Sequence, residues 1–178
     1  AIVAGHAFGH FVARVTDLDH PRLVCGVVVM AAAARVFPEG LSAALDIASD
    51  PAQPRANRIA ALRHAFFAPH HDPTPWLDGW HPHLRDAYRA AARTPPKDQW
   101  WPVANAPILD LQAADDPWRP PSTRNELRDA LGAQRVTVEL ITDASHALVS
   151  EQPAAVAEAI VHWVHTLCPM DSAHGTPA

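Results

Sequence analysis

The sequence opens with Ala1-Ile2-Val3-Ala4-Gly5-His6-Ala7-Phe8-Gly9. The apolar run over residues 1–4, followed by a turn between two glycines four positions apart, is typical of a short buried strand. The helix is predicted over residues 8–17. The next apolar run, residues 23–30, is rich in β-branched side chains without alternation, as in a strand covered on both faces of a parallel sheet. A strand, a helix and a parallel strand are therefore expected.

Residues 35–103 show the apolar spacing of helices rather than that of strands. Helical patterns occur over residues 41–48, 56–67 and 82–93, separated by prolines, and no strand-like run lies between them. This stretch is too long for a plain crossover, which needs about a dozen residues. We expect it to be a helical cap spanning residues 35–104.

After this stretch, patterns typical of alternating strands and helices return. The expected strands cover residues 108–111 and 135–141, and the expected helices cover residues 122–131 and 153–167. Ser122 is expected to cap the first of these helices. The predicted fold class is α/β, with a parallel sheet flanked by helices. Its core is divided into residues 1–34 and 105–168, and residues 169–178 are expected to form a tail.

Composition argues against several kinds of partner. The 178 residues are 48% hydrophobic, which suits one globular domain, and the 14 basic residues are scattered, without a footprint for nucleic acid. The longest apolar run, residues 23–34, is shorter than the ~20 residues of a membrane-spanning helix, so no membrane partner is expected. Cys25 and Cys168 form no disulfide framework, and a reducing, cytoplasmic compartment is the default expectation.

Polar residues that follow strands are the candidates for a site, because ligands bind at the carboxyl ends of strands in such sheets. Three segments qualify, namely Gly5-His6-Ala7-Phe8-Gly9, Asp115-Asp116-Pro117 and Ser145-His146-Ala147. A carboxylate beside an imidazole orients it for general-base chemistry. Asp116 and His146 are the predicted pair, and Asp115 is the competing carboxylate.

The order of tight turn, acid and histidine, each after a strand, resembles the α/β-hydrolase superfamily over nearly the whole chain. The turn is similar to the family's nucleophile elbow, G-x-S-x-G, except that Ala7 replaces the serine. Residues 109–117 resemble the acid-bearing strand and loop, with Asp116 as the acid, and residues 144–153 resemble the histidine loop around His146. The resemblance implies a parallel sheet with a helical cap. It also implies four strands and two helices before Ala1, so we expect the chain to be a C-terminal fragment of a longer protein.

The resemblance also implies roles for single residues near the elbow. The backbone N–H of Phe8 would form part of an oxyanion hole, and His6 is expected to be structural. His10 stands one helical turn beyond Ala7, where it could touch substrate or serve a structural role.

Other candidates come from their neighbours in the sequence. The candidate pocket residues are Trp100, Trp101, Trp118 and Leu148. Histidines at positions 70, 71, 81 and 83 match no zinc motif, so neither a metal nor a cofactor is expected.

Ala7 leaves the expected activity open, because a methyl group cannot attack a carbonyl carbon. The first expectation is a hydrolase of a small apolar ester, lactone or related carbonyl compound, in which His146, oriented by Asp116, activates water or takes a substrate proton. The second is a ligand-binding homologue without catalysis. The third is a Ser-to-Ala form of an ordinary serine hydrolase.

Overall fold

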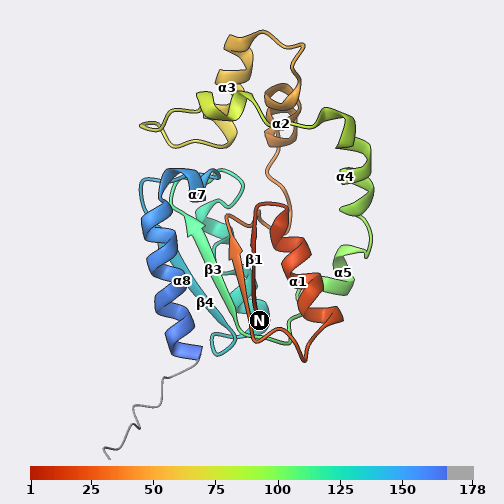
Figure 1. The fold of residues 1–178 in the computed structure, drawn as a ribbon, viewed down its shortest axis with the longest axis vertical. Coiled ribbons are helices and arrows are strands. Elements are labelled where there is room, and N and C mark those ends of the chain that lie inside the picture. The colour runs from red at the N-terminus through yellow and green to blue at the C-terminus, as the bar shows by residue number, and fades with distance from the viewer. Residues whose placement is uncertain (168–178) are drawn as a thin grey trace, which may run out of the picture.

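Four parallel strands form a single sheet in chain order in the computed structural model, which describes residues 1–167 (Figure 1). They are β1 (Ile2–His6), β2 (Gly26–Met30), β3 (Ile108–Ala113) and β4 (Val136–Ile141). Each pairs in parallel with the next, and within the described residues β1 pairs with β2 alone. The prediction of an α/β fold with a parallel sheet is confirmed. The predicted tail over residues 169–178, like Cys168, lies outside the described residues.

Helices cover both faces of the sheet. Helix α1 (Gly9–Asp19) lies on one face and α8 (Pro153–Leu167) on the other, as Figure 1 shows. In β2, Val27 and Val29 pack in the cluster beneath α1, while Val28 packs in the cluster beneath α8. Covering on both faces explains why this strand shows no alternation of apolar and polar residues.

The segment between β2 and β3 contains helices only, within the part of the chain that the structure describes. They are α2 (Leu41–Ser49), α3 (Arg55–Ala65), η1 (Thr74–Leu77), η2 (Pro82–Leu84), α4 (Arg85–Ala91) and α5 (Lys97–Trp100). Helices α2 and α3 lie beyond the carboxyl ends of the strands, and α4 and α5 descend beside α1 (Figure 1). The predicted boundaries of core and cap, at 34/35 and 104/105, remain predictions.

The capping role expected for Ser122 is wrong. That residue lies in the short helix η3 (Pro121–Thr123), and α6 (Glu126–Leu131) begins later, after Asn125, without a side-chain cap. The carbonyl of Arg124 accepts a hydrogen bond from Gln112 Nε2 at 2.7 Å. This carbonyl is thus engaged by β3, and the first helical hydrogen bond of α6 is accepted by the next carbonyl, that of Asn125, from the N–H of Asp129 at 2.7 Å. The last short helix, α7 (Leu148–Glu151), precedes α8.

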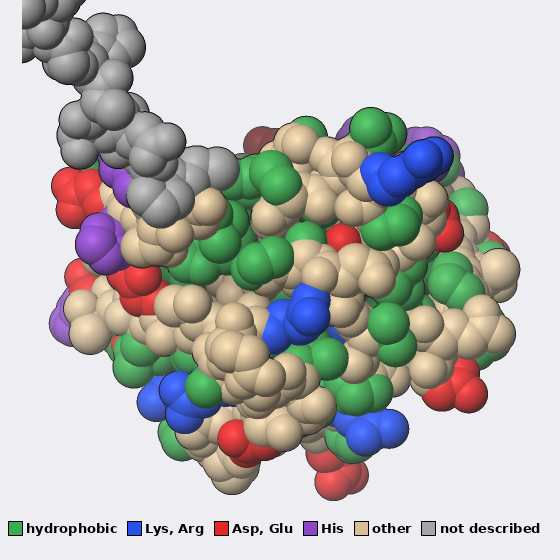
Figure 2. Space-filling view, turned by 90° about the horizontal axis from the view of Figure 1, so that it is seen from below, with side chains coloured by type: hydrophobic (Ala, Val, Ile, Leu, Met, Phe, Trp, Pro, Cys, Tyr) green, Lys and Arg blue, Asp and Glu red, His purple; other side chains and the backbone are tan. Residues whose placement is uncertain are grey.

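Charged groups are dispersed on the face at the amino ends of the strands. Figure 2 shows Lys and Arg side chains on this face scattered among apolar and acidic ones. Among residues 1–167, none of the helices has the length and apolarity needed to cross a bilayer.

Candidate active site

The turn after β1 is shaped by Gly5 and Gly9. A Cβ atom on Gly5 would lie 2.0 Å from the carbonyl oxygen of Gly9, so only glycine fits at position 5. Ala7, between them, has a φ of 49°, in the left-handed region that residues other than glycine rarely adopt. Its N–H donates to the carbonyl of Met30 at 2.9 Å. The turn therefore projects residue 7 sharply out of the chain at the carboxyl end of the sheet.

The backbone N–H of Phe8 follows Ala7 at the start of α1. Within the described residues, this N–H has no hydrogen-bond partner. The Phe8 ring stacks on Tyr88 of α4, with ring centroids 4.0 Å apart. A free N–H next to the turn is available to a negatively charged oxygen atom. The oxyanion-hole role that the resemblance implies for Phe8 remains a prediction.

His146 and Asp116 lie side by side beyond β3 and β4. The Nδ1 atom of His146 is 3.0 Å from Oδ2 and 3.3 Å from Oδ1 of Asp116. Both residues are buried, with 6% and 4% of their surface exposed, and the N–H of Trp118 donates to Asp116 Oδ1 at 2.9 Å. Asp115 is exposed, so the carboxylate that contacts the imidazole is that of Asp116. Two loops that start on neighbouring strands thus form one buried acid–imidazole contact.

The second nitrogen of His146 remains open. Its Nε2 atom makes no hydrogen bond within the described residues. This atom is also not among the unbonded polar atoms that are buried, so solvent can reach it. With Nδ1 held by a carboxylate, Nε2 of a neutral imidazole carries the lone pair that can accept a proton. This arrangement can act as a general base.

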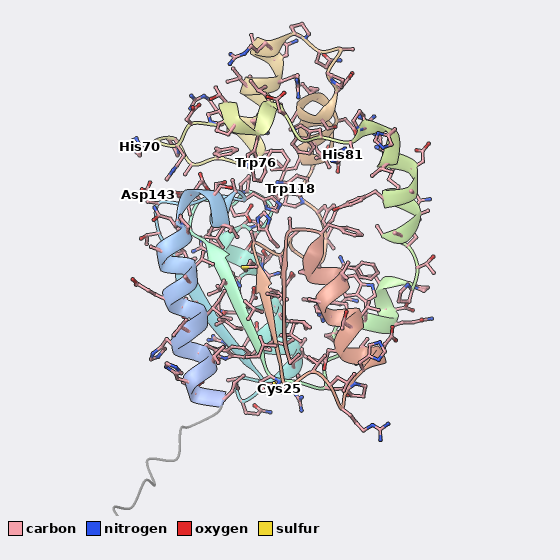
Figure 3. All side chains as sticks on the ribbon, in the orientation of Figure 1. Cys25, His70, Trp76, His81, Trp118 and Asp143 are labelled. Atoms are coloured by element: carbon pink, nitrogen blue, oxygen red, sulfur yellow. The ribbon has the colours of Figure 1, made fainter. Side chains whose placement is uncertain are left out.

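Aromatic rings surround the imidazole of His146. Trp118, Phe66 and His6 have ring centroids 5.4, 5.6 and 5.7 Å from it. Trp76, half-buried, packs on both Phe66 and His6. Figure 3 shows Trp76 and Trp118 in the layer between the sheet and the helices α2 and α3. The walls around the imidazole are therefore largely apolar.

His6 contacts the histidine loop directly. Its Nε2 atom lies 2.7 Å from the carbonyl oxygen of His146, which can only accept, so Nε2 carries the proton. Burial holds the pKa of His6 below its ordinary value, although this hydrogen bond acts in the opposite direction. The sequence suggested a structural role for His6, but it carried no signal for this contact with a residue 140 positions away.

Solved structures provide an independent comparison. The chain is similar to a protein described as "putative non-heme bromoperoxidase BpoC" from Mycobacterium tuberculosis H37Rv, with a TM-score of 0.72 and 24% identity over 94% of this chain and 67% of that one. It is also similar to a thermophilic esterase from Thermogutta terrifontis, with a TM-score of 0.71 and 18% identity over 93% of this chain and 65% of that one. The chain has the α/β-hydrolase fold.

A third similar structure is a meta-cleavage product hydrolase from Pseudomonas fluorescens IP01, with a TM-score of 0.68 and 19% identity over 93% of this chain and 65% of that one. The chain thus spans about two thirds of the length of these proteins. No family model and no curated protein matches the sequence.

His10, one turn into α1 of this α/β-hydrolase fold, faces α5 rather than open solvent. Its ring lies 5.7 Å from that of Trp100, and its Nδ1 is buried without a partner. Burial lowers the pKa of His10 to about 3, and the positive charge of Arg14 acts in the same direction. His10 is therefore neutral at physiological pH.

Trp100 and Trp101 pack on Arg14 of α1. The guanidinium carbon lies 5.1 and 4.7 Å from their ring centroids, and Arg14 donates to the Trp100 carbonyl at 3.0 Å. Burial lowers the pKa of Arg14 to about 10, so it keeps its charge at neutral pH. Both tryptophans belong to the cluster beneath α1, whereas Trp118 belongs to the cluster around α2 and α3.

Leu148, the remaining pocket candidate, is fully buried in the cluster beneath α8. The structure thus places Trp118 against His146, and places the other pocket candidates in separate clusters.

A buried ion pair lies behind the acid loop. Arg119 Nη2 is 3.1 Å from Asp110 Oδ2 in β3, and Nη1 is 3.1 Å from Glu126 Oε1. Burial raises the pKa of Asp110, while the charge of Arg119 acts against this rise. The N–H of Arg119 also donates to the Asp116 carbonyl at 3.1 Å. This pair was not predicted from the sequence. An aspartate within an apolar strand is the signal that could have indicated it, since a buried charge needs a partner.

Histidines of the helical segment do not gather into a metal site. Figure 3 shows His70 and His81 on opposite sides of this segment. Among residues 1–167, no three side chains of the metal-binding types come together.

Proposed function

We propose that this protein hydrolyses a small apolar ester, lactone or related carbonyl compound, with His146 as general base and Asp116 as its orienting partner. The observation that carries the proposal is the buried contact of 3.0 Å between His146 Nδ1 and Asp116 Oδ2, combined with an open Nε2. A positioned base of this kind contributes roughly 10²–10⁴-fold to a rate.

The chemistry must proceed without a serine nucleophile, because Ala7 offers only a methyl group. His146 therefore takes a proton from a water molecule that attacks the carbonyl carbon, or from the substrate itself. When water attacks, the tetrahedral intermediate carries a negative oxygen, which the free N–H of Phe8 would stabilise. Collapse of this intermediate breaks the bond to the alkoxide, which takes the proton back from His146 and leaves as the alcohol. Similar proteins described as an esterase and a hydrolase are consistent with this reaction class.

The apolar character of the proposed substrate follows from the walls of the site. Phe66 and Trp118 flank the imidazole, and half-buried Trp76 extends the same aromatic layer. These residues belong to one apolar cluster with residues of α2 and α3. To residues 35–104 we assign the role of a cap. Such surfaces favour apolar groups over charged ones.

A ligand-binding protein without turnover is the second candidate, and Ala7 is the observation that favours it. A serine hydrolase changed from Ser to Ala at this position would have the same appearance. Loss of one triad member still leaves about 10³–10⁴-fold catalysis over water in serine enzymes. Slow hydrolysis alone therefore does not distinguish these candidates.

Replacement of each member of the pair tests the proposal in the full-length protein. Hydrolysis of p-nitrophenyl acetate and δ-valerolactone would be measured for His146→Ala and Asp116→Asn. The matched controls are Asp115→Asn and His83→Ala, which alter exposed residues. We expect turnover to fall by about 10²-fold or more in the first two variants and to persist in the controls. Unchanged turnover in His146→Ala would reject the proposal, and saturable binding without turnover in the native protein would favour the second candidate.

A further inference from the structure

The last residue of α3 and the three residues after it form a buried turn. Residues 65–68, called the 65–68 turn below, are Ala65, Phe66, Phe67 and Ala68, and each has 7% or less of its surface exposed. The sequence pattern predicts a helix through residue 67, but α3 ends at Ala65. The last carbonyls of a helix have no partner within it and must find others. Here the carbonyl of Ala65, the last residue of α3, and that of Phe66, the residue after it, accept hydrogen bonds from the two loops of the candidate site.

The acid loop is bonded to the first residue of this turn. Trp118 Nε1 donates to the carbonyl of Ala65 at 2.7 Å. The backbone N–H of the same tryptophan donates to Asp116 Oδ1 at 2.9 Å. One residue therefore links the turn to the carboxylate that contacts His146.

The histidine loop is bonded to the turn on both sides of His146. After it, the N–H of Ala147 donates to the Phe66 carbonyl at 2.7 Å. Before it, the N–H of Ser145 donates to Glu151 Oε2 at 2.6 Å, while Glu151 Oε1 accepts from the N–H of Ala68 at 2.7 Å. The buried carboxylate of Glu151 thus joins the histidine loop to the turn through two charge-assisted hydrogen bonds.

We propose that the 65–68 turn is the template that sets the contact between Asp116 and His146, with Trp118 and Glu151 as positioning residues. The turn contacts both loops, so it fixes their relative placement as well as the placement of each. This inference rests on the proposed function for its catalytic consequence. By this inference, residues 35–104 help to position His146, in addition to covering the substrate.

The contact between Asp116 and His146 is sensitive to any shift of the two loops that the 65–68 turn holds. The sheet bonds the two loops to each other near their bases, where the N–H of Asp115 donates to the Ala144 carbonyl at 2.9 Å. Beyond that point the side chains of Asp116 and His146 must still approach to 3.0 Å. A displacement of about 1 Å in a catalytic group can cost up to about 10²-fold in rate.

Two substitutions test the template in the full-length protein. Glu151→Gln removes one acceptor and turns an amide N–H₂ toward a backbone N–H, without touching the His146 ring. Trp118→Phe keeps an aromatic ring but removes the donor to Ala65. The matched controls are Glu158→Gln, at an exposed position of α8, and Trp163→Phe, at a buried position of the same helix, in the cluster between α8 and the sheet.

The readouts are the NMR signal of the His146 Nδ1–H proton and the separate values of kcat and KM. We expect this proton to exchange with water about tenfold faster or more in Glu151→Gln and Trp118→Phe, and kcat to fall about tenfold with KM within about twofold. Both controls should retain the native signal and kcat. The NMR signal does not depend on turnover, so a native protein without activity would contradict the proposed function alone.

An unchanged Nδ1–H signal in both folded variants would overturn the template. If Trp118→Phe does not fold, as judged by circular dichroism, Glu151→Gln alone carries the test. Global unfolding of both variants would also overturn it, because the turn would then hold the whole fold rather than the acid–imidazole pair.

Discussion

Nε2 of His6 lies 2.7 Å from the carbonyl oxygen of His146, so the elbow turn and the histidine loop are joined by a direct hydrogen bond. The two residues are 140 positions apart. His6 is the last residue of β1, and His146 follows β4, the first and last strands of the described sheet. The bond holds the backbone of His146 against the turn that carries Ala7. It therefore links the placement of the base to the place where the substrate carbonyl would lie.

Removal of this donor should weaken the native state measurably. We expect His6→Phe, which keeps a ring but loses the N–H, to reduce the free energy of unfolding by about 1–3 kcal/mol, because a partly buried carbonyl is left without its partner. Urea unfolding of the native protein and the variant measures the difference. The control is His162→Phe on the exposed side of α8. An equal loss in the control would show that the hydrogen bond to His146 contributes nothing.

The elbow predicts opposite effects for its two glycines. Alanine at position 5 would place a Cβ atom 2.0 Å from the Gly9 carbonyl oxygen, whereas a Cβ atom on Gly9 meets no atom within 4 Å. We expect Gly5→Ala to cost about 4 kcal/mol or more, or to prevent folding. Gly9→Ala should change the free energy of unfolding by about 1 kcal/mol at most, and in the stabilising direction, because alanine favours a helix. Thermal and urea unfolding measure both, and similar costs at the two positions would contradict the geometry.

The parts of the site that the sequence predicted are those with a local pattern. Apolar runs identified the strands, and the residue types after them identified Asp116 and His146 as neighbours. The parallel order of β3 and β4 makes that inference physical, because their carboxyl ends meet at one edge.

The parts that the sequence did not reveal depend on contacts between distant segments. Nothing near Glu151 shows that its carboxylate bonds to Ala68, 83 positions earlier. Likewise, the residues around Trp100 do not show that it packs on Arg14, 86 positions away. The end of α3 is of the same kind, since the carbonyls of its last residue, Ala65, and of the following Phe66 are bonded by Trp118 and Ala147.

The partly buried His10 should make stability depend on pH in a defined direction. Its pKa is about 3 in the folded protein and about 6.5 when exposed, because burial disfavours the charged ring. Above pH 6.5 neither state binds the proton. Between about pH 6.5 and 3 only the unfolded chain binds it, so the free energy of unfolding falls as pH falls, by at most about 1.4 kcal/mol per pH unit.

Comparison with His10→Phe isolates this contribution from that of other titrating groups, including His6. Urea unfolding at pH 7, 6, 5 and 4 should show a difference between the two proteins that is constant above about pH 6.5 and then shifts steadily in favour of the variant. Parallel curves down to pH 4 would mean that His10 is protonated in the native state. Arg14, Lys97 and Arg119 supply the positive charges that oppose this protonation.

Restoration of a hydroxyl at position 7 is the sharpest test of how the site works. Ala7 already adopts the left-handed φ of 49° beside a free Phe8 N–H, so Ala7→Ser places an Oγ atom in this turn without new backbone strain. If the reaction formerly required a serine, hydrolysis of p-nitrophenyl acetate should rise by about 10²-fold or more, with a burst of acyl-enzyme.

Ala7→Gly is the matched control, since it suits the same φ without a hydroxyl. The gain should disappear in the double variant Ala7→Ser/His146→Ala. Equal turnover of the native protein, Ala7→Ser and Ala7→Gly, abolished in each by His146→Ala, would instead indicate that His146 acts on water or on the substrate directly, which is the mechanism proposed for the native chain.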